Sequence, residues 1–412
     1  MKSLAPSRLA YWRGALQFAG DGFDLITQRV HGIHRAIADK PFQTLAPLPA
    51  IGDSTAPVRQ LHDSITDGVY GVVRLSGNAL IGAAAEVLKQ ADRVMPPTPV
   101  TPDFHRDSAI AALGGLFGDH AARKRNPLMP QLGFYKDGSR HALTPAALAE
   151  AYPQATRKLV VFVHGLSCTE HGWKFYVDPA QPDTADYGTR LAVEFGYTPL
   201  YLRYNTGLHI SKNGRRLSRQ LAQLLVGWPT EVDEIVLIGH SMGGLVLRAA
   251  AAHAMTLNEG WASKVSRLIC LGSPHRGAPL EQAVDGLTRV LGRFDLTRPW
   301  GELLEARSVG VRDLKHGATS DADWRSGVTR EWRPPQAIAR LPHAQYHFIG
   351  CSLGASERDP LGQFLGDGLV RLPSSLAADL ADAHTVTLFK VNHMRLLNHP
   401  LVYRHLREAI AR

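Results

Sequence analysis

One segment, residues 234–248, constrains the fold of this chain more than any other. It reads EIVLIGHSMGGLVLR: an apolar run that predicts a buried strand, a glycine-flanked turn, and an apolar stretch that predicts a helix. In such a turn the middle residue, Ser241, is held on a strained backbone at the end of the strand. Side chains at Gly239 and Gly243 would collide where strand and helix pack closely. The segment therefore nominates the Ser241 hydroxyl as a nucleophile.

Apolar strands alternate with helical segments on both sides of this turn. The predicted strands are 159–163, 199–203, 235–238, 268–271, 346–349 and 385–389, and 133–141 is expected to form a hairpin around Asp137 and Gly138. Continuous apolar strands separated by helices are typical of a mostly parallel sheet with helices on both faces. We therefore expect an α/β domain over residues 129–412.

The alternation lapses between Pro279 and Pro342. The interval carries apolar residues at helical spacing and three tryptophans, and it is too long for a plain connection between two strands. It favours a cap or lid over the site, at about 280–342. A peripheral helical decoration without substrate contact is the alternative.

The N-terminal third of the chain predicts helices and no strand. Residues 8–93 have helical character, interrupted by prolines at 41, 47 and 49, and one predicted helix face carries Phe23, Ile26, Val30, Ile33 and Ile37. A proline-rich linker over 96–102 and an apolar helix over 107–120 follow. We therefore divide the chain into an N-terminal helical extension (1–95), a linker and helix (96–128), and the α/β domain with its cap insertion.

The second helical stretch, about 60–92, is small and uncharged between Arg74 and Glu86. This composition fits tight packing of helices through small residues, or contact with a membrane. We expect packing. We judge the stretch too short to cross a bilayer, and no transmembrane span or signal peptide is evident in the sequence. A cytoplasmic protein is expected, with peripheral membrane contact through these helices left open.

Charge and cysteine content narrow the expected partners. The formal net charge is +9, which suits an anionic surface, but no nucleic-acid motif accompanies it, so we expect a solvated basic surface and no nucleic-acid partner. The three cysteines are too few for a disulfide framework and lack metal-ligand spacing. We expect neither a metal nor an organic cofactor. The sequence does not predict an oligomeric state.

A nucleophilic serine needs a base and an acid that orients the base, in the chain order serine, acid, histidine. Asp367, between two glycines after the penultimate predicted strand, is the favoured acid over Asp359, which precedes a proline. His393 follows the last predicted strand, so it can reach back to Ser241. Three other histidines are weaker candidates for the base. His384 precedes the last predicted strand, and His399 and His405 lie in the closing helical segment.

An oxyanion intermediate needs preorganised N–H donors. The amide of Met242, directly after the nucleophile, is one candidate, and the loop after the 159–163 strand should supply the other. We favour Leu166 in that loop, with Ser167 and Cys168 as alternatives. Two further residues follow strands at the same sheet edge and are candidate substrate contacts, although ordinary turn chemistry would explain them equally: Asn205 and His275.

Together these motifs resemble the α/β-hydrolase superfamily, and most closely the bacterial lipases and esterases of the triacylglycerol-lipase and PGAP1-like group. The resemblance covers roughly 130–412 and is carried by the segments 163–166, 239–244, 271–277, 366–370 and 392–393. It implies hydrolysis of a small-molecule or lipid carboxylic ester through an acyl-enzyme under a movable cap. Acyl transfer, amide or thioester hydrolysis, and a lipid-binding module with a vestigial site remain open alternatives.

Overall fold

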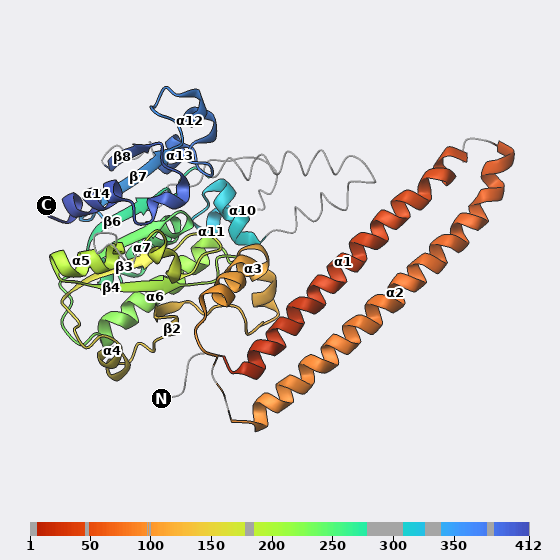
Figure 1. Ribbon diagram of the computed structural model, residues 1–412, viewed down its shortest axis with the longest axis horizontal. Coiled ribbons are helices and arrows are strands. Elements are labelled where there is room, and N and C mark those ends of the chain that lie inside the picture. Colours follow the sequence, from red (N-terminus) through yellow and green to blue (C-terminus); the bar gives the residue numbers. More distant parts are fainter. Residues whose placement is uncertain are drawn as a thin grey trace.

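A single eight-stranded sheet forms the centre of the main body in the computed structural model (Figure 1). The structure describes residues 6–45, 49–96, 98, 100–177, 185–277, 308–325, 339–376 and 383–411. The strand order is β2-β1-β4-β3-β5-β6-β7-β8. The strands are β1 (Gly133–Lys136), β2 (Ser139–Arg140), β3 (Lys158–Val163), β4 (Tyr197–Arg203), β5 (Glu234–His240), β6 (Val265–Leu271), β7 (Gln345–Ser352) and β8 (His384–Phe389).

The pairing of these strands confirms the predicted sheet. β3 to β8 run parallel, whereas β1 is antiparallel to both β2 and β4. Each predicted strand is present, lengthened by one to four residues, and Asp137 and Gly138 make the predicted turn with positive φ. Because the strands are parallel, their carboxyl ends meet at one edge, where ligands bind in such sheets.

Helices cover both faces of the sheet. Alternate residues of β3 enter two separate cores: Val161 packs with Leu221 of α6 and Leu245 of α7, and Phe162 packs with residues of α5 and α14. The helices of the body are α4 (Pro145–Ala151), α5 (Tyr187–Phe195), α6 (Ile210–Gly227), α7 (Met242–Leu257), α12 (Pro360–Leu365), α13 (Leu372–Ser375) and α14 (Pro400–Ala411), with short 3-10 turns η1 (Glu170–Lys174), η3 (Gly260–Lys264) and η4 (His393–Leu396). The predicted arrangement of helices on both faces is confirmed.

The predicted cap falls mainly on residues 278–307 and 326–338, which lie outside the described residues. Between them, α10 (Val309–His316) and α11 (Asp321–Arg325) pack beside the start of α6. Asp313 of α10 lies 3.0 Å from Nδ1 of His209, whose ring stacks on Trp324 at 4.1 Å between centroids. This part of the insertion is therefore anchored at the N-terminus of α6.

The N-terminal part forms a long helical hairpin that projects from the body (Figure 1). α1 (Arg8–Leu45) and α2 (Pro49–Val94) are separate helices, and the break between them lies near the predicted Pro47 and Pro49, whereas the break predicted at Pro41 was wrong because α1 continues through that residue. The predicted packing through small residues holds at only one of the three glycines of that stretch: a Cβ on Gly77 would lie 2.2 Å from the Phe23 ring, whereas a Cβ on Gly71 or Gly82 would meet no atom within 4 Å. A third helix, α3 (Phe104–Arg123), is capped by Asp103 and returns the chain to the body.

The prediction that this region is too short to cross a membrane was wrong. The helical segment Arg59–Val94 is 36 residues long, and an 18-residue window within it has a mean hydropathy of 1.2. By length and composition it could span a bilayer. The helix runs through its polar residues without a break.

Candidate active site

Ser241 lies at a sharp turn between β5 and α7. Its backbone has φ +53° and ψ −123°, and its amide donates to the carbonyl of Leu271 at the end of β6, at 2.8 Å. A positive φ is costly for a residue with a side chain, so the surrounding bonds must hold it. The turn places the serine at the carboxyl edge of the sheet, where it is largely buried.

The glycines around the serine are required by close approach. A Cβ on Gly243 would lie 2.1 Å from the carbonyl oxygen of Val163, and one on Gly239 would lie 2.5 Å from the amide nitrogen of Gly244. Neither contact is possible without moving backbone. The same packing brings β3, whose last residue is Val163, against the start of α7.

Asp367 and His393 form a buried pair. Nδ1 of His393 lies 2.7 Å from Oδ2 of Asp367, and the His393 amide donates to the Asp367 carbonyl at 3.0 Å. The amides of Leu369 and Val370 donate to Oδ1 of Asp367 at 2.9 and 2.7 Å. Burial by itself would raise the pKa of Asp367, but the His393 contact and these amides hold that pKa below its ordinary value. The geometry keeps the carboxylate charged and the imidazole oriented.

This pair lies beside the serine turn. The ring of His240, the residue before Ser241, is 4.8 Å from the His393 ring between centroids, and its Nε2 lies 3.2 Å from the His393 carbonyl. A Cβ on Gly272, at the end of β6, would lie 3.1 Å from Cε1 of His393. The structure therefore brings the predicted serine, acid and histidine segments to one place. Within the described residues the Ser241 hydroxyl makes no hydrogen bond, so its contact with His393 stays a prediction.

The two neighbouring histidines are buried and uncharged near neutral pH. Burial lowers the pKa of His164 to about 4 and that of His240 to about 3. The His164 ring stacks on Tyr204, 4.5 Å between centroids, and its Nδ1 lies 2.9 Å from the Gly165 carbonyl. These rings shape the site without adding positive charge to it.

The loop after β3 approaches the serine closely. A Cβ on Gly165 would lie 3.0 Å from Cβ of Ser241. The two alternative oxyanion donors of this loop already have acceptors within the protein. The Ser167 amide donates to Oγ1 of Thr206 at 3.2 Å, and the Cys168 amide donates to the Gly165 carbonyl. In the described part of the chain the Leu166 amide has no acceptor. Of the three candidates in this loop, Leu166 alone keeps a free donor.

The amide of Met242 has the position expected of the other donor. Met242 is the first residue of α7, and the first N–H groups of a helix have no partner within it. The positive end of the helix dipole lies at the same place. Its role as an oxyanion donor stays a prediction.

The proposed substrate contacts gain no support from their surroundings. Asn205 is buried, with Nδ2 donating to the Gly118 carbonyl at 2.9 Å and Oδ1 accepting from the Gly207 amide at 3.0 Å. His275 is buried as well, and its Nδ1 lies 2.8 Å from Nη1 of Arg248. Burial and the Arg248 charge hold the pKa of His275 well below its ordinary value. Both side chains are engaged with the protein itself.

The residues that competed for the acid and base roles lie elsewhere. Oδ2 of Asp359 accepts from the Ala355 amide at 2.7 Å, as a turn-forming aspartate does. His384 begins β8, at the opposite end of the strand from His393, and lines a small cavity with His347 and His405. His399 precedes α14, where its carbonyl accepts from the Tyr403 amide.

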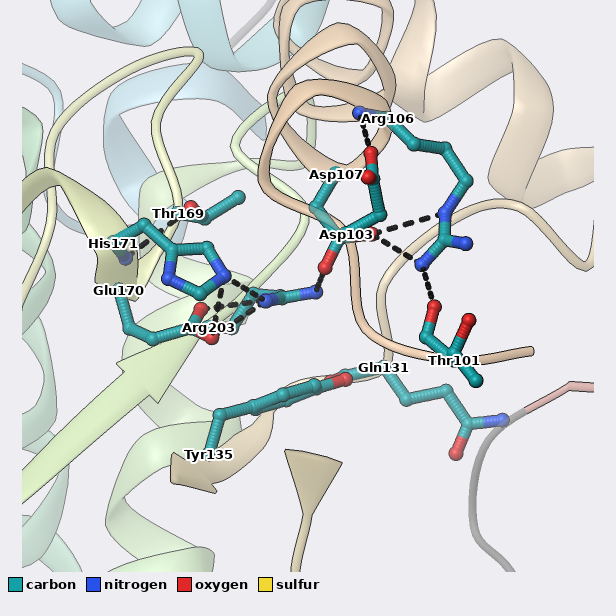
Figure 2. Close-up of polar contacts among 10 residues, drawn as sticks. All are labelled: Thr101, Asp103, Arg106, Asp107, Gln131, Tyr135, Thr169, Glu170, His171 and Arg203. Atoms are coloured by element: carbon teal, nitrogen blue, oxygen red, sulfur yellow. Dashed lines mark hydrogen bonds and ion pairs between the residues drawn. The ribbon is translucent and has the colours of Figure 1, made fainter. Parts of the chain in front are cut away.

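A buried ionic network, which the sequence did not indicate, lies behind the loop after β3 (Figure 2). The Arg203 guanidinium, at the end of β4, donates to both carboxylate oxygens of Glu170 and to Oδ2 of Asp107, the last at 2.9 Å. It also lies over the Tyr135 ring, 4.4 Å from the centroid. Through Arg203, the network connects Asp107 of α3 with Glu170 of η1, which follows the loop that contains Leu166 and Cys168. No motif marks it, because its members are far apart in the sequence.

No cluster of three or more histidine, cysteine or acidic side chains that could hold a metal ion occurs among the residues that the structure describes.

Comparisons with known proteins agree with this architecture. Residues 154–326 match the family model described as a PGAP1-like alpha/beta domain. A triacylglycerol lipase from Burkholderia plantarii is 30% identical over 157 residues, which are 37% of this chain and 39% of the lipase. The matched part thus spans about two fifths of that relative's length.

Solved structures include similar chains of low identity. A gene product of Listeria innocua has a TM-score of 0.38 and 15% identity, covering 62% of this chain and 94% of that one. An esterase of Pyrococcus furiosus has a TM-score of 0.34 and 13% identity, covering 63% and 82%. The mostly parallel sheet covered on both faces and the strand–serine–helix turn have the architecture of the α/β-hydrolase fold, and residues 154–326 are similar to the PGAP1-like alpha/beta domain.

Proposed function

We propose that this protein hydrolyses carboxylic esters through an acyl-enzyme formed on Ser241. The observation that carries the proposal is the buried His393–Asp367 pair, 2.7 Å between Nδ1 and Oδ2, beside the strained serine turn. A base held in one tautomer by a buried carboxylate is what a weak serine nucleophile requires.

In the proposed mechanism, His393 Nε2 removes the proton from the Ser241 hydroxyl as its oxygen attacks the ester carbonyl carbon. Asp367 holds the imidazole and stabilises its protonated form. The amides of Leu166 and Met242 donate to the tetrahedral oxyanion. The leaving alcohol then takes the proton from His393. A water molecule, deprotonated by His393, attacks the carbonyl carbon of the acyl-enzyme. The bond from that carbon to Ser241 Oγ then breaks, His393 returns the proton to Oγ, and the carboxylic acid is released.

The test is hydrolysis of a p-nitrophenyl ester series from acetate to palmitate. Ser241→Ala should lower kcat/KM by at least about a thousandfold, and a fluorophosphonate probe should label the wild type alone. His393→Ala should be equally inactive, whereas alanine variants of the histidines at 384, 399 and 405 should keep their activity. Undiminished turnover by Ser241→Ala would overturn the assignment.

The lipase homologue supports a lipid or small-molecule ester as the substrate class. Deletion of 280–342 tests the proposed cap, because chain-length selectivity should change when the cover over the site is removed. Acyl transfer to another acceptor, or thioester or amide hydrolysis, uses the same triad, and added alcohol or amine acceptors would reveal transfer in product analysis. A folded wild type that neither turns over esters nor reacts with the probe would indicate a binding module.

A further inference from the structure

The charged side chains in the middle of α2 lie on the side of that helix that faces α1. Between Gln60 and Ala85, α2 carries three acidic or basic charges, and each faces α1. Asp67 lies 2.9 Å from Nε2 of His31, and Arg74 Nε donates to Asp24 at 2.8 Å. Asp63 pairs with Arg35 at 3.8 Å. A surface helix of a water-soluble protein has the reverse arrangement, with its apolar stripe buried and its charges outward.

The outer face of α2 is apolar along most of its length. Large aliphatic side chains recur at spacings of three, four and seven residues and are exposed: Leu61, Ile65, Val69, Val72, Val73, Leu75, Leu80 and Val87. Leu75 and Leu80 are 74% and 73% exposed. Ile26 and Val30, which the sequence predicted on one apolar face of a helix, are exposed on α1 as well. Nothing in the described chain covers this surface, which exceeds the scattered apolar residues of ordinary protein surfaces.

The length of the apolar stretch matches a bilayer. From Leu61 to Val87 the helix rises roughly 39 Å, against a hydrocarbon core of about 30 Å. Charges lie at both ends: Arg59 pairs with Asp39 at 2.8 Å near the tip, and Glu86, Lys89 and Arg93 lie toward the body. Core helices of soluble proteins can equal this length and hydropathy, but only 6% of the window is buried here.

We propose that the α1–α2 hairpin inserts its outer apolar face into the hydrocarbon of a lipid bilayer and so anchors the α/β domain at a membrane. The charges in the middle of α2 are partly exposed, at 49% for Asp67 and 38% for Arg74, but each has a partner on α1, as polar side chains within membrane bundles have. Close contact through Gly20 and Gly77 fits the same setting, because small residues let helices approach where water does not drive their association. The inference does not depend on the proposed ester hydrolysis.

The test is flotation of the full-length protein with vesicles of phosphatidylcholine alone, which carry no net charge. The wild type should float equally well in about 0.1 M and 0.5 M salt, because apolar insertion is not screened. Leu75→Glu/Leu80→Glu should lower the bound fraction at least about tenfold. Val193→Glu/Val226→Glu is the matched control, since both valines are exposed on the α/β domain, at 82% and 88%.

Two outcomes would overturn the proposal. One is a wild type that stays with the soluble fraction and forms a dimer or larger species that the Leu75 and Leu80 variant dissociates, which would assign the face to a second copy of the chain. The other is flotation only with anionic lipid, which would assign binding to the basic surface. Circular dichroism of each variant checks that the helices are retained, so a loss of binding is not a loss of folding.

Discussion

The Nδ1 atom of His393 lies 2.7 Å from the Oδ2 atom of Asp367, and the other carboxylate oxygen accepts two backbone amides. The acid is thus fully engaged before any substrate is bound, and its orientation is set by the loop 366–370, where Gly366 and Gly368 have positive φ. A base pre-oriented in this way needs little rearrangement when the serine reacts.

Asp367→Asn tests that orientation. Oδ1 of the amide could still accept from Leu369 and Val370, but its NH₂ group would face Nδ1 and favour the other imidazole tautomer. We expect kcat for p-nitrophenyl acetate to fall by about ten-thousandfold. Asp359→Asn is the matched control, at the carboxylate that forms a turn, and should keep wild-type turnover. Equal activity of the two variants would remove Asp367 from the mechanism.

Gly243→Ala tests the close packing at the serine turn. Its Cβ would lie 2.1 Å from the Val163 carbonyl oxygen and 2.7 Å from that of His164, so backbone must shift. We expect a loss of roughly 3 kcal/mol or more in the free energy of unfolding, measured by urea denaturation, together with loss of activity. A Cβ on Gly260 would meet no atom within 4 Å, so Gly260→Ala should be close to the wild type. A stable, active Gly243→Ala protein would contradict this account.

Arg203→Met tests the buried network of Figure 2. The substitution leaves the carboxylates of Glu170 and Asp107 buried without their shared cation, which typically costs about 3–5 kcal/mol. Arg157→Met removes an exposed pair with Asp233 and should change the unfolding midpoint little. Equal midpoints for the two variants would show that the network does not stabilise α3 against the sheet.

The buried histidines predict an acid-sensitive fold. The unfolded chain takes up protons at His164 and His240 below about pH 6.5, whereas in the folded protein their pKa values are about 4 and 3. Stability is therefore complete above pH 6.5 and falls as the pH drops toward 4, by about 2 kcal/mol per histidine at pH 5. His240→Gln should lose less stability than the wild type between pH 7.5 and 5.

Urea unfolding at the two pH values measures this difference. The quantity compared is the change in the free energy of unfolding between pH 7.5 and pH 5, because the substitution also alters packing and therefore shifts the stability at each pH. His105→Gln, at an exposed position of α3, should keep the wild-type dependence on pH. Identical pH dependence of all three proteins would contradict the burial argument.

Local sequence determined the sheet and its nucleophile turn. Apolar runs separated by helical stretches give parallel strands covered on both faces, and the strands observed differ from the predicted ones only at their ends. The serine turn was readable because strand, glycines and helix lie within fifteen consecutive residues, 234–248. Asp367 and His393 could be nominated because chain order and strand ends limit where an acid and a base can lie.

Contacts between distant residues were decided only by the tertiary structure. Arg203, Glu170 and Asp107 carry no local pattern, because the fold alone brings α3, β4 and the turn after β3 together. Asn205 and His275 lie at the predicted sheet edge, but only the folded chain shows that Gly118 and Arg248 engage them. The hairpin is a further case. The sequence predicted helices there, but only the folded chain shows that the charges in the middle of α2 pair with side chains of α1 and that its large aliphatic side chains are exposed on the other side.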